Sequence, residues 1–151
     1  MAEARWLDPH EQRAWRAFLR VHTELNARLG RQLQNESGLS AADYAVLVEL
    51  SESPDGQLRP YELQQRLLWE QSRVSHHLAR MQQRGHIRRE GCTTDGRGAH
   101  IVLTDAGRRA IVAAAPGHVA AVRRLFFDRL TDAQVSALEQ LSTQVLDGLD
   151  G

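Results

Sequence analysis

One stretch of this sequence carries hydrogen-bond donors and positive charge but no acid. Between Gln71 and Arg84 there is no aspartate or glutamate, whereas the flanking segments mix charges of both signs. Val74, Leu78 and Met81 are spaced by four and three, which predicts a helix over about residues 71–84 with these side chains buried. The opposite side then exposes Ser72, Arg73, Ser75, His76, Ala79 and Arg80. Such donors suit the base edges and phosphates of a DNA major groove.

The glycine-rich loop after this helix could place a second positive charge. Residues 87–90 and 100–103 have the composition of short strands, so the loop between them predicts a β-hairpin. The loop contains Asp95-Gly96-Arg97-Gly98, in which glycine permits close approach and the arginine can project. A DNA minor groove attracts such a charge. We expect Arg97 to lie in a wing that contacts DNA, with an ordinary turn as the alternative.

The net charge of the chain hides an uneven distribution. The 151 residues carry 19 arginines, no lysine and 19 acids. Residues 59–97 hold eight arginines against four acids, while both flanking segments are net acidic. A basic centre between acidic flanks could direct one face of a neutral protein toward phosphate. The alternative is an ordinary solvated helix face with an accidental excess of positive charge.

The elements that would hold these residues are mostly helices. N-cap residues, first-turn prolines and apolar periodicity predict them over about residues 9–34, 41–51, 60–67, 71–84, 105–126 and 132–149. Leu58 suits a very short strand, Gly85 ends the fourth helix, and Pro116-Gly117 should kink the fifth. The predicted fold class is mainly α with a small β-hairpin. A helix, a short turn, a second helix and a hairpin form a winged helix-turn-helix.

Composition argues against a membrane protein and against an exported one. The longest apolar run, which contains Ile111 to Ala115 and begins at Ala110, is far below the roughly 20 residues that a membrane span needs. The N-terminus carries Glu3 and Asp8 and has no apolar region typical of a signal peptide. We therefore expect a soluble cytoplasmic protein without a membrane partner.

The sequence offers no arrangement typical of catalysis or of a bound metal. It contains no glycine-rich phosphate loop, no Gly-x-Ser-x-Gly motif and no His-Glu-x-x-His motif. The adjacent His76 and His77 would point about 100° apart on a helix and could not share a metal ion. Cys92 is the single cysteine, so it cannot form an internal disulfide or a four-cysteine metal site. We expect no enzymatic activity, no cofactor and no metal.

Several of these segments together resemble the multiple-antibiotic-resistance regulator (MarR) family, and the resemblance extends over nearly the whole chain. It rests on residues 71–81, 84–87, 95–98 and 103–107. It implies one domain over residues 1–151, with a winged helix-turn-helix lobe at about 40–103 and dimerisation helices at about 8–34 and 105–149. It also implies a homodimer that binds pseudo-palindromic double-stranded operators and often releases them when a small ligand binds. Leu68-Trp69-Glu70 departs from the family's small turn residues, which predicts a less tight turn and requires a place for Trp69 to pack.

The resemblance assigns DNA-contacting roles by position. The helix from Gln71 to Arg84 would enter the major groove, and Arg97 would be the arginine of the wing tip. Asp95 would orient neighbouring arginines rather than touch DNA. Phosphate contacts would come from Arg59 and from the base of the hairpin. The full predicted set is Arg59, Gln71, Ser72, Arg73, Ser75, His76, Arg80, Arg88, Arg89, Asp95 and Arg97.

The two ends of the chain predict a dimer, because each carries an apolar helix face that a single small lobe cannot bury. The first helix has an apolar stripe that is too long for one small lobe, and the last helix carries a similar stripe. Pairing these helices across a two-fold axis would bury both stripes and set two recognition helices roughly 34 Å apart. The alternative is a monomer in which all these helices fold back on one another. The first stripe consists of Trp15, Phe18, His22, Leu25, Leu29 and Leu33.

Four single residues leave further alternatives open. Trp15, His22 and Tyr44 could line an effector crevice between the dimer core and the DNA-binding lobe, although core packing is the simpler interpretation of each. Cys92 could sense oxidants, although it begins a hairpin loop and is more simply a passive thiol. Two other functions therefore stay possible: a winged-helix module that binds proteins, and a cysteine-based redox-responsive regulator.

Overall fold

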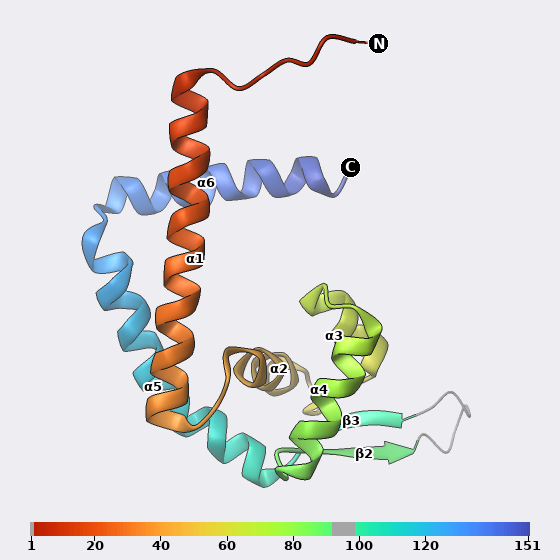
Figure 1. Ribbon diagram of the computed structural model, residues 1–151. Helices are drawn as coiled ribbons and strands as arrows, with labels where there is room; N and C mark the ends of the chain where they lie inside the picture. The colour runs from red at the N-terminus through yellow and green to blue at the C-terminus, as the bar shows by residue number, and fades with distance from the viewer. Residues whose placement is uncertain (1, 92–98) are drawn as a thin grey trace.

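The computed structural model describes residues 2–91 and 99–151 (Figure 1). Cys92, Asp95 and Arg97 lie outside the described residues, so the predictions made for them stay predictions. The elements are α1 (Pro9–Ser37), α2 (Ala41–Glu52), β1 (Gln57–Leu58), α3 (Pro60–Leu67), α4 (Gln71–Gln83), β2 (Ile87–Gly91), β3 (Ala99–Leu103), α5 (Asp105–Leu125), the 3-10 helix η1 (Phe127–Arg129) and α6 (Asp132–Leu149).

Reciprocal capping boxes fix the start of three helices. Asp8 accepts a hydrogen bond from the backbone N–H of Glu11, and Glu11 accepts one from the backbone of Asp8, at 2.7 and 3.0 Å. Ser40 begins α2 and Thr131 begins α6 by the same exchange. Each box satisfies backbone donors that the first helical turn leaves without a partner. The predicted starts of these helices are confirmed.

A small antiparallel sheet follows α4 and is built around β3. The strand order is β1-β3-β2, with Leu58 opposite Ile101 and Ile87 opposite Leu103. The strands of the predicted hairpin are confirmed, and the very short strand at Leu58 is confirmed as β1. The pairing of β1 with β3 was not anticipated, and it extends the hairpin into a three-stranded sheet.

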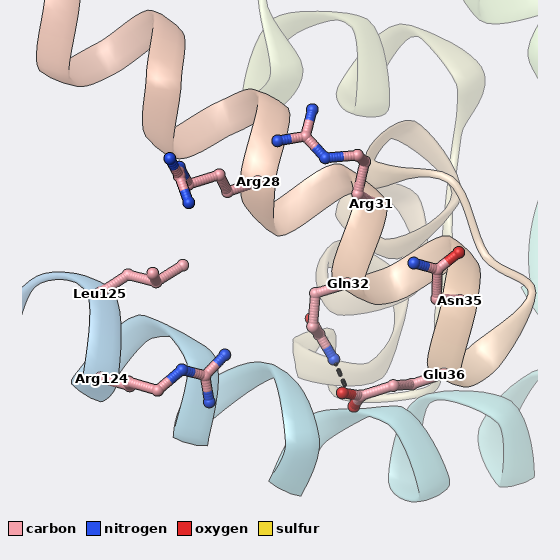
Figure 2. A pocket seen from close by; sticks show the side chains of 7 residues that line it. All are labelled: Arg28, Arg31, Gln32, Asn35, Glu36, Arg124 and Leu125. Atoms are coloured by element: carbon pink, nitrogen blue, oxygen red, sulfur yellow. Dashed lines mark hydrogen bonds between the residues drawn. The ribbon is translucent and has the colours of Figure 1, made fainter.

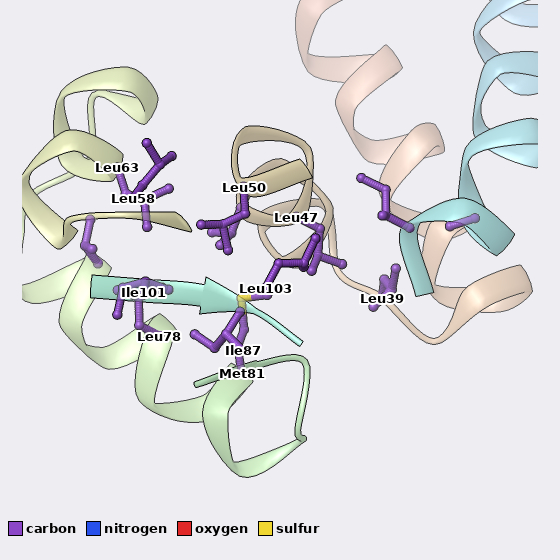
Figure 3. Close-up of a cluster of buried hydrophobic side chains, with 14 residues drawn as sticks. Leu39, Leu47, Leu50, Leu58, Leu63, Leu78, Met81, Ile87, Ile101 and Leu103 are labelled. Atoms are coloured by element: carbon purple, nitrogen blue, oxygen red, sulfur yellow. The ribbon is translucent and has the colours of Figure 1, made fainter. Parts of the chain in front are cut away.

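The hydrophobic core lies between the sheet and helices α2, α3 and α4 (Figure 3). Val74, Leu78 and Met81 are at most 3% exposed, so the buried side of α4 is the predicted one. Ile87 and Ile101 bring the sheet into the same cluster. The core therefore fixes which side of α4 faces outward.

Helices α1 and α5 pack together beside this lobe, and α5 changes direction along its length (Figure 1). Pro116 lies inside α5, in keeping with the predicted kink. By length and composition alone, the segment Asp105–Arg129 could cross a membrane. Its first half instead packs on the core, where Ile111 and Ala114 are buried.

The outer parts of the long helices lack a partner within one chain. Of the α1 side chains only Leu33 is buried, and no α6 side chain is buried among the described residues. Large apolar groups are half exposed or more, including Trp15, Phe18, Val119, Leu141 and Val145. The unmet burial predicted from the sequence is therefore present in the structure.

Candidate nucleic-acid interface

The outward side of α4 is an exposed surface of donors. Gln71 and all five predicted donor residues after it are exposed, while the three apolar residues are buried. Arg73 and Arg80 are seven positions apart, so they share one face and lie about 10 Å apart along the helix axis. Glu70 caps α4 without a side-chain hydrogen bond. The first-turn N–H groups are thus left without a side-chain cap, and this is the kind of helix end that binds phosphate. The donors on this face are Gln71, Ser72, Arg73, Ser75, His76 and Arg80.

The turn between α3 and α4 spans residues 68–70 and is closed by a backbone hydrogen bond, and the expectation that it is looser than the family's turn stays a prediction. Leu68 adopts a left-handed conformation with φ 55°, and its side chain is 88% exposed. The backbone N–H of Trp69 then bonds to the carbonyl of Gln64 at 3.3 Å, which closes the turn. By pointing outward, Leu68 leaves the inner position to Trp69, whose ring packs against the core.

Trp69 also contacts two side chains of α4. The guanidinium carbon of Arg73 lies 4.2 Å from the centre of the Trp69 ring, a cation–π geometry. The ring of His77 meets the Trp69 ring edge-on, with centres 5.6 Å apart. A single aromatic side chain in the turn therefore links an exposed arginine to the interior.

A buried carboxylate joins α4 to the start of α2. Asp43 is 4% exposed, and its two oxygens lie 2.9 Å from Nε2 of His77 and 3.1 Å from Nη1 of Arg84. Nη2 of Arg84 also donates to the carbonyl of Gly38 at 2.8 Å. This network was not predicted from the sequence. Its one readable signal was Ser40-x-x-Asp43, a capping-box spacing that places the aspartate at the helix start but says nothing about α4.

The environment of Asp43 predicts how stability depends on pH. Burial by itself raises the pKa of Asp43, but the His77 contact and the hydrogen bonds from Ser40 outweigh it and hold this pKa well below the usual aspartate range. A depressed folded-state pKa gives stability that is present above the unfolded value of about 3.9 and is lost as the pH falls through the folded value.

Asp43→Asn is therefore expected to lower the free energy of unfolding by about 2 kcal/mol at neutral pH, because hydrogen bonds to a charged group contribute about that much to stability. The difference in the free energy of unfolding between wild type and variant should narrow once the pH falls below about 4, because the wild type then loses the contribution of the charged carboxylate. Urea unfolding at several pH values measures it. Asp55→Asn, in the exposed turn before β1, is the control and should show a small gap at every pH. A gap for Asp43→Asn that stayed constant down to pH 2 would contradict this account.

The predicted phosphate contacts occupy different surroundings. Arg88 on β2 pairs with Glu90 at 2.8 Å, and both side chains are about half exposed. Such a surface pair is weak, so Arg88 can exchange Glu90 for a phosphate. Arg89 is exposed on the same strand. Arg59 is the N-cap of α3 and is half-buried, with its backbone N–H bonded to Glu62. Arg88 and Arg89 are thus exposed and Arg59 is half-buried, in the same lobe as α4.

The three predicted effector residues do not line one cavity within a single chain. Tyr44 borders a cavity of about 290 Å³ between α2 and α5, and its ring lies 4.5 Å from that of His118. Burial raises the pKa of Tyr44 and lowers that of His118. Trp15 is exposed, with its ring tilted 31° to that of Phe18 and the ring centres 5.9 Å apart, and His22 is exposed and contacts Asn26 at 3.1 Å.

A second cavity of about 290 Å³ lies where α1 meets α5 (Figure 2). Its lining includes three arginines, Arg28 and Arg31 from α1 and Arg124 from α5. Gln32 donates to Glu36 at 2.7 Å inside this lining, and Gln32 also lies 3.4 Å from His118. This cavity is open and carries net positive charge.

Comparisons with known proteins agree on one family. A family model described as MarR family matches residues 37–98. Sco3205, a MarR family transcriptional regulator from Streptomyces coelicolor solved in complex with DNA, is 42% identical, with a TM-score of 0.93 over 99% of this chain and 93% of that one.

Two further solved structures share the architecture. AbsC, a MarR family regulator from Streptomyces coelicolor, is 38% identical, with a TM-score of 0.91 over 98% of this chain and 99% of that one. CouR from Rhodococcus jostii RHA1, bound to p-coumaroyl-CoA, is 22% identical, with a TM-score of 0.73 over 85% and 88%. A comparison with curated protein sequences gives no match.

Proposed function

This chain belongs to the MarR family of transcriptional regulators, and we propose that it binds a pseudo-palindromic double-stranded DNA operator as a homodimer. One observation carries the proposal. The acid-free face of α4 is exposed on a chain that is 42% identical, over 99% of its length, to a regulator solved with DNA. MarR family members are transcription factors rather than enzymes. A DNA-bound regulator acts in the cytoplasm, where we place this protein.

We assign the DNA contacts to two groups of residues. The exposed donors of α4, from Gln71 to Arg80, enter the major groove and reach both base edges and the phosphates beside it, while Arg59, Arg88 and Arg89 contact phosphate only. The exposure of the α4 donors and the weak pairing of Arg88 support this division. Arg97 and Asp95, which lie outside the described residues, complete the predicted contact set.

Loss of Arg80 tests the DNA-binding face. Arg80→Ala is expected to weaken operator binding at least about ten-fold. It should also lower the slope of log Kd against log salt concentration by roughly 0.9 per half-site, because the variant neutralises one phosphate fewer and binding therefore releases fewer counterions. Fluorescence anisotropy at several salt concentrations, with a duplex selected from a random pool, measures both quantities.

Arg20→Ala is the matched control for this test. It removes the same charge from an exposed site on α1, where Arg20 pairs with Glu24 at 3.0 Å, far from α4 in the sequence. Its affinity and salt slope should match those of the wild type. Equal slopes for Arg80→Ala and Arg20→Ala would place the DNA elsewhere and favour a winged-helix module that binds a protein partner.

The proposal includes regulation by a small ligand. Ligand responsiveness is typical of the family, and CouR, which shares this fold, was solved with p-coumaroyl-CoA bound. We assign the effector to the cavity beside Tyr44, where Trp15 and His22 could contribute only from the α1 helix of a second copy. A thermal-shift screen on wild type and Tyr44→Ala tests this assignment. A compound that binds in this cavity should raise the unfolding temperature of the wild type but not that of the variant.

Cys92→Ser tests the redox alternative, which predicts that the variant loses any response to oxidants.

A further inference from the structure

We propose that Trp69 is a positioning residue that holds the Arg73 guanidinium ready to read a guanine in each operator half-site. The inference rests on the proposed DNA-binding function and adds to it a residue that determines specificity without touching DNA. It starts from the contact between an exposed arginine on the DNA-facing side of α4 and a tryptophan in the preceding turn.

The position and geometry of Arg73 suit base reading. It is the third residue of α4, and residues near the start of a recognition helix are those that reach base edges. An arginine paired with guanine donates two parallel hydrogen bonds, to O6 and N7, and this pairing demands a fixed orientation. A guanidinium that lies over an aromatic face can still donate through its in-plane N–H groups. The Trp69 contact therefore restricts Arg73 without consuming its donors.

The Trp69 ring is itself fixed from behind. It packs against the hydrophobic core and meets the His77 ring edge-on, and His77 contacts the buried carboxylate of Asp43. Arg84 holds the other oxygen of Asp43 and the carbonyl of Gly38. These contacts connect the Trp69 ring, on which Arg73 lies, to the start of α2.

The backbone of the turn also supports a positioning role for Trp69 over a chance contact with Arg73. Leu68 takes a left-handed conformation, which is unfavourable for a residue other than glycine, and it leaves its own side chain in solvent. The same turn places Trp69 inward, beneath Arg73. An arginine that only had to neutralise phosphate would need neither a fixed orientation nor an aromatic support. The observations therefore favour base reading by Arg73.

The test uses duplexes selected from a random pool by the wild-type protein. We expect a guanine at one position of each half-site, and replacing it with adenine should cost about ten-fold or more in affinity. Replacing it with 7-deazaguanine removes the N7 acceptor while keeping the base pair, and should cost several-fold. Arg73→Ala should abolish both penalties. Failure of the wild type to enrich any duplex would instead overturn the proposed function itself.

Trp69→Leu separates positioning from mere presence of the arginine. It should reduce the adenine penalty about five-fold and remove most of the 7-deazaguanine penalty, while the salt slope stays unchanged because every charge remains. Trp69→Tyr keeps a ring under Arg73 and should restore discrimination. Circular dichroism and thermal unfolding confirm that each variant folds. Full discrimination in folded Trp69→Leu would overturn the inference, as would stronger guanine preference, which would mean that Trp69 withholds Arg73 from DNA.

Discussion

Replacing Gly107 with alanine is expected to lower the free energy of unfolding by about 3 kcal/mol, at the upper end of typical overpacking costs. A Cβ at this position would collide with the carbonyl oxygen of His86 and would lie 2.8 Å from Cδ1 of Leu103. Neither neighbour can yield easily. The His86 carbonyl accepts the backbone N–H of Thr104 at 3.2 Å, and Thr104 is the residue that caps α5. Relief of the clash would have to separate α5 from the start of β2.

Gly117 in the same helix provides the control. A Cβ there would lie 2.6 Å from Oε2 of Glu36, the far end of an exposed, flexible side chain that can rotate away by giving up its hydrogen bond from Gln32. Alanine is also the better helix former by about 1 kcal/mol, so Gly117→Ala should leave stability unchanged or raise it slightly. Urea unfolding of both variants at one protein concentration measures the difference. A loss below 0.5 kcal/mol for Gly107→Ala would show that α5 is free to move at its start.

The parts of the fold that the sequence predicted well are those determined by near neighbours. Capping boxes act over three residues, and the buried side of α4 follows from a three-and-four spacing. The Gly85 stop is equally local, because a left-handed residue with φ 83° strongly favours glycine. Helix starts, the α4 stop and the outward face of α4 could therefore be read without knowledge of the rest of the chain.

The contacts that tune the candidate site could not be read in this way. Asp43 meets Arg84 across 41 positions, and nothing in either local sequence distinguishes this aspartate from one that only caps a helix. Trp69 was recognised as a residue in need of a packing place. Its partners, Arg73 and His77, could not be predicted, because they depend on the left-handed conformation of Leu68, which sets the direction of the turn. Contacts of this kind depend on tertiary packing and not on periodicity.

The exposed apolar faces of α1 and α6 lead to the prediction with the largest effect on assembly. Val145→Glu is expected to convert the homodimer into a 17.0 kDa monomer. The side chain of Val145 is 58% exposed in one chain, beside exposed Leu141 and Leu149. Losing the burial of that exposed part costs about 1–2 kcal/mol per copy, and a two-fold axis applies that cost twice, so Kd for dimerisation should rise roughly 30–1,000-fold. The charge introduced at an apolar contact adds to this.

Gln144→Glu introduces the same carboxylate one position away, and it separates a specific contact from a general effect of charge. Adjacent helical residues point about 100° apart, so the control should remain dimeric in light scattering at matched concentrations. Operator affinity should fall with dimerisation in Val145→Glu, because a monomer can place only one α4 helix on the DNA. If Val145→Glu stayed dimeric, the two-fold contact would have to use other apolar groups, such as Trp15 and Phe18 of α1. If it became monomeric and kept its operator affinity, the need for two recognition helices would be disproved.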